Sequence, residues 1–160
     1  MKPQFSDRYQ GLKCRVCLVM ENPSAKPLEM NGELDIYNLV KEEMLSSDRE
    51  IMLSVLLNGM NKIIGVENVA IGNLNSCTWS PSNMLKSAIL ANAAAIVVCH
   101  NHPSGSLTPS AQDIQMTDKL VKAGKIMGIM IHDHLIISHE GYRSIIHETK
   151  PKRKESEHAI

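Results

Sequence analysis

The sequence predicts an α/β domain in which buried strands alternate with helices. Residues 50–57 are too apolar to lie on a surface, and the alternating segment 62–71 follows them after an Asn-Gly turn. Ser80-Pro81 and Thr108-Pro109 each combine an N-cap residue with proline at the first helical position. The wholly apolar residues 95–99 lie between these two helix starts, so strands and helices alternate along the chain.

The first half of the chain is predicted to hold three strands and one helix. Residues 14–20 are mostly apolar and end at a turn-forming Asn-Pro-Ser, which predicts a strand. Residues 33–45 carry apolar side chains close to helical spacing, which predicts a helix. The strands at 50–57 and 62–71 follow, joined by the turn at 58–61.

The second half is predicted to continue the alternation. A helix runs from Ser80-Pro81 to about Asn92, and the strand 95–99 follows it. A second helix starts at Thr108-Pro109 and runs to about Lys125. The remaining predicted elements are strands at 128–132 and 135–138 and a last strand or short helix at 142–147.

Composition favours a single cytoplasmic domain. The 160 residues carry 17 basic and 17 acidic side chains, a balance that gives no support for a nucleic-acid-binding surface but does not exclude a local patch. The sequence contains no apolar run long enough to span a bilayer and no secretory signal. We expect a flexible N-terminus at 1–11, one domain at 12–149 and a charged, disordered tail at 150–160.

One passage of the sequence carries residues suited to metal chemistry. His100 and His102 project to the same side of an extended segment, and Ser110 and Asp113 share one face of a helix. Two imidazoles and one carboxylate form the three-ligand set that zinc uses when a fourth position stays open for water. A polar turn followed by a helix-stabilising Asp113 is the alternative for the His-x-His pair alone, but the combined pattern favours a metal site.

These residues resemble the metal motif of the JAMM (MPN+) metalloproteases. The resemblance is closest to the RadC-type branch, where Asn101 stands in place of the usual Ser or Thr, and it extends from about Asp48 to Ser144. It is carried by Asn92–Ile96, His100–Gly105, Pro109-Ser110 and Asp133-His134. It implies a cytidine-deaminase-like α/β fold with a mixed central sheet flanked by helices. We expect the chain to lack the helix-hairpin-helix segment of longer RadC proteins, which weakens the expectation of a DNA role.

The resemblance also implies a function, the hydrolysis of a peptide or isopeptide bond by water that zinc activates. It implies that His100, His102 and Asp113 hold Zn²⁺ and that Ser110 donates to the substrate carbonyl. An upstream glutamate would serve as the base, and Glu50 occupies the matching place before an apolar strand. From the residues alone, Glu42, Glu43 and Glu67 compete with Glu50 for this role.

The substrate would be a protein or peptide that the sequence does not identify, and whether the chain forms a homodimer stays open. The alternative function is a metal-binding accessory module in DNA repair or DNA metabolism, without proteolytic activity.

Two other motifs resemble metal or redox sites. His132-Asp133-His134 lies at a strand end, but no suitably spaced carboxylate follows it, so we expect these residues near the site or in hydrogen bonds that orient its ligands. Cys14 and Cys17 would point to opposite faces of a strand and lack a second CxxC pair, which favours ordinary thiols. We interpret Cys99 as a small core residue.

Overall fold

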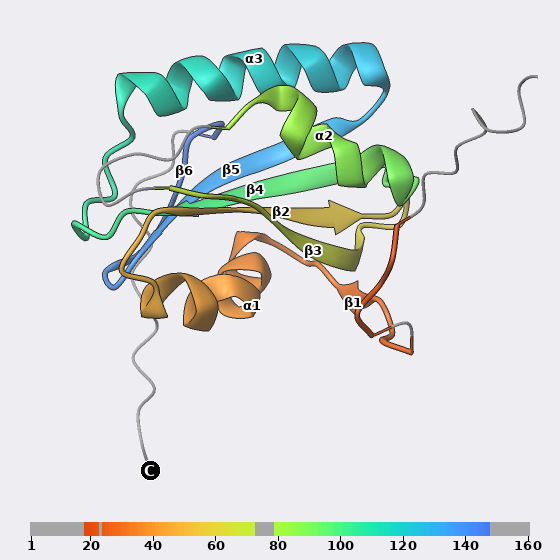
Figure 1. Ribbon diagram of the computed structural model, residues 1–160, viewed down its shortest axis with the longest axis horizontal. Coiled ribbons are helices and arrows are strands. Elements are labelled where there is room, and N and C mark those ends of the chain that lie inside the picture. Colours follow the sequence, from red (N-terminus) through yellow and green to blue (C-terminus); the bar gives the residue numbers. More distant parts are fainter. Residues whose placement is uncertain (1–17, 23, 73–78, 148–160) are drawn as a thin grey trace, which may run out of the picture.

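The computed structural model describes residues 18–22, 24–72 and 79–147, which form a curled mixed sheet with helices on both faces (Figure 1). The helices are α1 (Glu33–Ser46), α2 (Pro81–Leu90) and α3 (Ala111–Met127). The strands are β1 (Leu28–Glu29), β2 (Ile51–Leu57), β3 (Lys62–Ile71), β4 (Ala95–Asn101), β5 (Met130–Ser138) and β6 (Gly141–Ser144).

The six strands of the described residues lie in the order β1-β3-β2-β4-β5-β6. The pair β4–β5 is parallel and is connected through α3, whereas every other neighbouring pair is antiparallel. The sheet is therefore mixed, as the resemblance to JAMM proteins implied. Its central strands β2 and β4 are buried along their whole length, which agrees with their apolar sequences.

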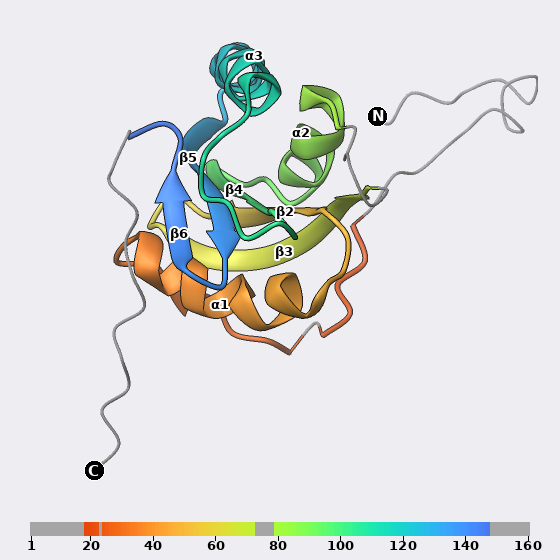
Figure 2. The ribbon, with the colours of Figure 1, turned by 90° about the vertical axis from the view of Figure 1, so that its left-hand side faces the viewer.

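The helices form two layers, with α1 on one face of the sheet and α2 and α3 on the other (Figures 1 and 2). Alternate side chains of β2 point to opposite faces of the sheet. Leu53 and Val55 pack with α1, whereas Met52 and Leu56 pack with α2 and α3. Cys99 of β4 is a fully buried thiol in the α1 layer, as the sequence predicted. Each face of the sheet therefore has its own apolar core.

Four predicted elements are confirmed with small changes at their ends. The helix at 33–45, the strands at 50–57 and 62–71 and the helix that begins at Pro81 are α1, β2, β3 and α2. The side chain of Ser80 accepts a hydrogen bond from the backbone N–H of Asn83, which is the N-cap that the Ser-Pro pair predicted.

The start of α3 was predicted two residues too early. The N-cap is Ser110 and the first helical residue is Ala111, so Thr108-Pro109 belongs to the preceding loop. The capping box of Ser110 and Asp113 explains the difference, because it satisfies two backbone N–H groups where Thr108 would satisfy one. The helix continues to Met127, and Gly128 caps its C-terminus in the left-handed conformation at φ 70°.

Three predictions for strands also need correction. The segments 128–132 and 135–138 are one strand, β5, because its parallel ladder with β4 continues from Met130 to Ile137. β4 itself runs two residues further than predicted, to Asn101. The described part of the strand predicted at 14–20, residues 18–20, is not a strand.

Several predictions concern parts of the chain that the structure does not describe. Cys14, Cys17, the proposed flexible segment 1–11 and the charged tail 150–160 all lie outside the described residues. In the described part of the chain, no helix has both the length and the apolar character needed to cross a membrane.

Gly124 lets α3 pack closely against the chain that leads into β5. A Cβ atom at this position would lie 2.5 Å from the carbonyl oxygen of Ile129 and 2.9 Å from the side chain of Ile131. We therefore expect Gly124→Ala to lower the free energy of unfolding by about 1–3 kcal/mol, although alanine normally favours a helix. Chemical denaturation measures this change. The matched substitution Gly59→Ala, where nothing lies within 4 Å, should have little effect; equal stability of both variants would contradict the expectation.

Candidate metal centre

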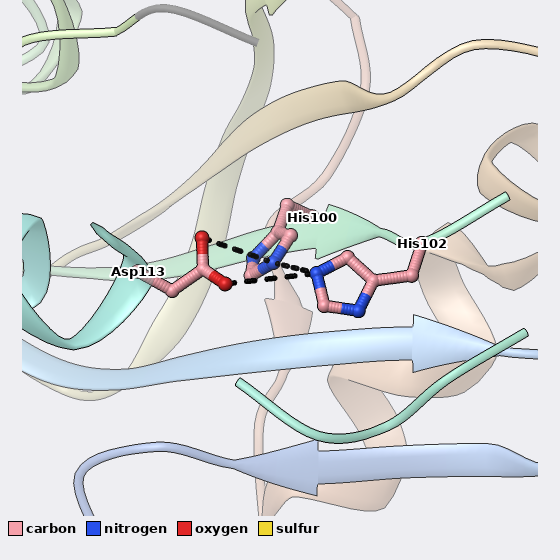
Figure 3. A group of neighbouring side chains, drawn as sticks. All are labelled: His100, His102 and Asp113. Atoms are coloured by element: carbon pink, nitrogen blue, oxygen red, sulfur yellow. Dashed lines mark hydrogen bonds and ion pairs between the residues drawn. The ribbon is translucent and has the colours of Figure 1, made fainter. Parts of the chain in front are cut away.

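His100, His102 and Asp113 converge at the end of β4 that faces the first turn of α3 (Figure 3). His100 is the penultimate residue of β4 and His102 follows the strand, so the extended backbone directs both rings to one side. Asp113 lies in the first turn of α3, which the loop 103–110 brings back over the strand end. Two consecutive elements, β4 and α3, thus supply one cluster of three donor groups.

The three side chains have the spacing of a metal-ligand set. Nε2 of His100 lies 2.9 Å from Nε2 of His102, and these two atoms lie 3.6 and 3.7 Å from the two carboxylate oxygens of Asp113. One ligand atom from each residue lies within 4.8 Å of the others. Tetrahedral ligands about 2.0–2.1 Å from zinc are about 3.3 Å apart, which is within the observed range. The residues therefore fit a zinc ion.

The N-terminal capping box of α3 holds the carboxylate of Asp113 in place through two hydrogen bonds with Ser110. The Ser110 hydroxyl accepts from the backbone N–H of Asp113 at 3.1 Å, and Oδ2 of Asp113 accepts from the backbone N–H of Ser110 at 2.7 Å. This capping box fixes the rotamer of Asp113 and turns its carboxylate toward the imidazoles. The cap uses only an oxygen lone pair of Ser110, so the hydroxyl hydrogen is available for another acceptor.

Hydrogen bonding leaves Nε2 of His102 suited to metal coordination. Nδ1 of His102 lies 2.8 Å from the carbonyl oxygen of Ser106. Because a carbonyl oxygen only accepts, Nδ1 carries the proton, and in the neutral ring Nε2 carries a lone pair. The other imidazole, His100, places Nδ1 2.7 Å from Nε2 of His134 on β5, and both of these rings are fully buried.

The environment separates the proton affinities of the three candidate ligands. Burial lowers the pKa of His100 to about 4. The contact with Asp113 raises the pKa of the His102 ring, although partial burial opposes it. For Asp113, burial favours the neutral acid, but the interactions with His102, His100 and Ser110 outweigh it and hold the pKa well below its usual range. At neutral pH the site therefore presents a carboxylate and at least one neutral imidazole.

Glu50 lies on the same side as the candidate ligands, just before the first residue of β2. Met52 pairs with His100 in the antiparallel ladder, and Glu50 comes two residues before Met52, so strand alternation directs Glu50 to the face of the sheet that His100 occupies. The charge of Glu50 also contributes to the raised pKa of His102. Of its competitors, Glu42 and Glu43 are exposed on α1, across the sheet. Glu67 lies opposite Ser54 on β3, which β2 separates from β4. The structure thus brings Glu50 to the site, while its role as a base stays a prediction.

The side chain of Asn101 holds the backbone on both sides of Glu50. Its Oδ1 accepts from the N–H of Ile51 at 2.7 Å, and its Nδ2 donates to the carbonyl of Arg49 at 3.0 Å. A further bond at 3.1 Å reaches the carbonyl of Met44 at the end of α1. Asn101 thus connects the His-x-His segment directly to the start of β2.

The three residues of the second His-x-His motif separate around a β-bulge. Ile96 pairs with Ile131 and Val97 pairs with Asp133, so His132 is the extra residue in the β4–β5 ladder. After the bulge, the side chain of His134 lies on the same face as His100. Asp133 instead accepts hydrogen bonds from Ser144 and the backbone of His134, and His132 contacts Asn61. The expected location near the site is thus found for His134, whereas His132 is directed elsewhere.

Sequence reasoning did not assign roles to Asn101 and Thr117. Thr117 lies one helical turn after Asp113, a spacing that places both on one face of α3, and its hydroxyl contacts His134 at 2.6 Å. Asn101 stands between the two histidines, but its three backbone partners are about 50 residues away in sequence. The helical spacing from Asp113 was a sequence signal for the role of Thr117. The role of Asn101 depends on sheet pairing, which no local pattern specifies.

Comparison with known proteins identifies the family. The model of the RadC-like JAB domain matches residues 30–150, which include every residue of the site described above. The chain belongs to the RadC-like JAB family. The match agrees with the mixed sheet and with the His-His-Asp cluster at the end of β4.

Curated relatives of this RadC-like JAB domain are longer proteins. A UPF0758 protein of Moorella thermoacetica is 45% identical over 111 residues, covering 69% of this chain and 48% of the relative. A UPF0758 protein of Clostridium novyi is 44% identical over 142 residues, covering 89% of this chain and 58% of the relative. The chain thus spans about half the length of these relatives.

Proposed function

We propose that this RadC-like JAB domain is a zinc-dependent hydrolase that cleaves a peptide or isopeptide bond. The observation that carries the proposal is the convergence of two imidazole nitrogens and one carboxylate, one ligand atom from each within 4.8 Å of the others. Three protein ligands leave a fourth coordination position, which is typical of catalytic zinc sites and not of structural ones. The nearby carboxylate of Glu50 adds the base that such hydrolysis requires.

The donor set favours zinc over the harder cations. Imidazole nitrogens suit zinc and other transition metals, whereas calcium and magnesium prefer oxygen ligands. His100, His102 and Asp113 would hold the ion. When bound, zinc supplies a Lewis acid that polarises the substrate carbonyl and lowers the pKa of a coordinated water toward about 7.

Two further residues would act on the substrate and the water. Glu50 would accept a proton from the attacking water and return it to the leaving amine, a role that commonly contributes about 10²–10⁴-fold in rate. The Ser110 hydroxyl, whose oxygen already caps α3, would donate its hydrogen to the carbonyl oxygen as negative charge develops. Asn101 would keep Glu50 in place through its bonds to the two neighbouring residues.

Zinc affinity is expected to fall as the pH falls, because a proton on His102 competes with the ion. The pKa of His102 is raised above its usual 6.5, whereas His100 stays neutral down to about pH 4. At pH values between the pKa of His100 and that of His102, His102 must lose one proton for each zinc ion bound. The apparent zinc affinity should therefore drop about tenfold for each unit by which the pH is lowered. Competition titration with a chromophoric chelator at several pH values measures this slope. An affinity independent of pH over this interval would contradict the assigned ligands.

The hydrolytic function is tested by exposing the purified, zinc-loaded chain to libraries of peptides and of isopeptide-linked conjugates. We expect cleavage that stops when a chelator removes the metal and returns when zinc is restored. Cleavage that persists without metal would contradict the proposal. A chain that binds zinc but cleaves no member of either library would favour the metal-binding accessory module instead.

A further inference from the structure

We infer that Thr117 and His134 form a hydrogen-bonded relay that sets the ring tautomer of His100 and so presents its Nε2 lone pair to the metal. Both are positioning residues, because neither contributes a ligand atom to the cluster. The inference rests on the proposed metal site for its purpose. The relay itself is a property of the metal-free chain and can be tested there.

The relay consists of three short contacts in series. The hydroxyl of Thr117 donates to the backbone carbonyl of Asp113 at 2.6 Å. The same oxygen lies 2.6 Å from Nδ1 of His134, and Nε2 of His134 lies 2.7 Å from Nδ1 of His100. The chain of contacts therefore begins at the backbone of one candidate ligand and ends at the ring of another.

The first contact determines the direction of all the others. A carbonyl oxygen has no hydrogen, so the single hydroxyl hydrogen of Thr117 is committed to Asp113. Nδ1 of His134 must then donate to the Thr117 oxygen, which leaves Nε2 of the neutral His134 ring as an acceptor. Nδ1 of His100 donates to that acceptor, and Nε2 of His100 is left with its lone pair directed at His102 and Asp113.

Burial prevents water from replacing any member of the relay. His100 and His134 are 0% exposed and Thr117 is 4% exposed. The indole of Trp79 packs against the ring of His134 with an interplanar angle of 88° and a centroid distance of 5.9 Å. Complete burial disfavours a positive charge on the His134 ring, in keeping with the neutral ring of the relay.

The bulge in β5 brings His134 into this position. Without the extra residue His132, strand alternation would place Ile131 and His134 on opposite faces of the sheet. With the extra residue, Ile131 and His134 both lie in the α2–α3 layer, between Thr117 of α3 and His100 of β4. The relay therefore links three elements, α3, β5 and β4, at the candidate metal centre.

Ring-nitrogen NMR of the metal-free chain tests the tautomer directly. At mildly alkaline pH, above the usual pKa of histidine, we expect His100 and His134 to carry their protons on Nδ1 in the unsubstituted protein. We expect the same in Thr117→Ser, which keeps the hydroxyl. In Thr117→Val, which keeps the shape and loses the hydroxyl, a share of both rings should be protonated on Nε2.

Zinc affinity provides the second readout. Loss of a residue that orients a metal ligand typically weakens binding about 10–100-fold, so we expect this loss in Thr117→Val and recovery in Thr117→Ser. Protonation of His100 on Nε2 in the unsubstituted protein would overturn the relay, and so would unchanged tautomers in a folded Thr117→Val. If Thr117→Val does not fold, the His100 tautomer of the unsubstituted protein still shows whether the relay exists. Failure of that protein to bind zinc would contradict the proposed function while leaving the tautomer result intact.

Discussion

Replacing Glu50 with glutamine is expected to leave zinc bound and to lower the rate of hydrolysis by about 10²–10⁴-fold. Glutamine has nearly the same shape as glutamate but cannot accept a proton at neutral pH. Glu50 comes two residues before Met52, the ladder partner of His100, and its charge contributes to the raised pKa of His102. It is not one of the three converging ligands. Activity and metal content should therefore respond differently to this substitution.

The experiment compares the cleavage rate and the zinc content of Glu50→Gln with those of Glu43→Gln. Glu43 is exposed on α1, on the opposite face of the sheet, so Glu43→Gln should leave the cleavage rate and the zinc content unchanged. Full activity in Glu50→Gln would show that another group accepts the proton. Loss of zinc from the same variant would instead make Glu50 a ligand, which the present geometry does not support.

Replacing His102 with alanine is expected to weaken zinc binding by more than about 100-fold, the upper range for losing a residue that only orients a ligand. His102 supplies one of three ligand atoms and has its Nε2 prepared by the bond from Nδ1 to Ser106. It is less buried than His100, so its removal should disturb the core less. Competition titration with a chelator of known affinity measures the change.

The matched control for this substitution is His139→Ala. His139 is exposed in the turn between β5 and β6, so removal of its ring should leave the high-affinity site unchanged. Equal zinc affinity in the two variants would mean that the ion binds elsewhere. Circular dichroism of both variants shows whether the fold is retained.

The alternation of strands and helices could be predicted from sequence because it depends on local signals. The apolar run in β2 and the Ser-Pro pair before α2 specified those elements. The start of α3 was predicted wrongly because Thr108-Pro109 and Ser110 both carry capping signals, and only the hydrogen bonds of the folded chain distinguish them. Competing caps within three residues cannot be ranked by propensity alone.

The candidate site was predictable where its residues are close in sequence. His100, His102 and Asp113 have a spacing that predicts convergence, and the structure brings them together. The family resemblance pointed to Glu50 before the apolar strand, but the β2–β4 pairing that brings this strand beside His100 was not predicted. The contact between His134 and His100 depends on a one-residue bulge at His132, and nothing in the local sequence specifies where a strand gains an extra residue.

The most direct test of this account is the zinc stoichiometry of the chain purified without chelator, measured by elemental analysis before and after incubation with zinc. We predict about one zinc ion per chain, held by His100, His102 and Asp113 as the open three-ligand set implies. Absence of zinc from the purified chain, together with no uptake at neutral pH, would contradict the account.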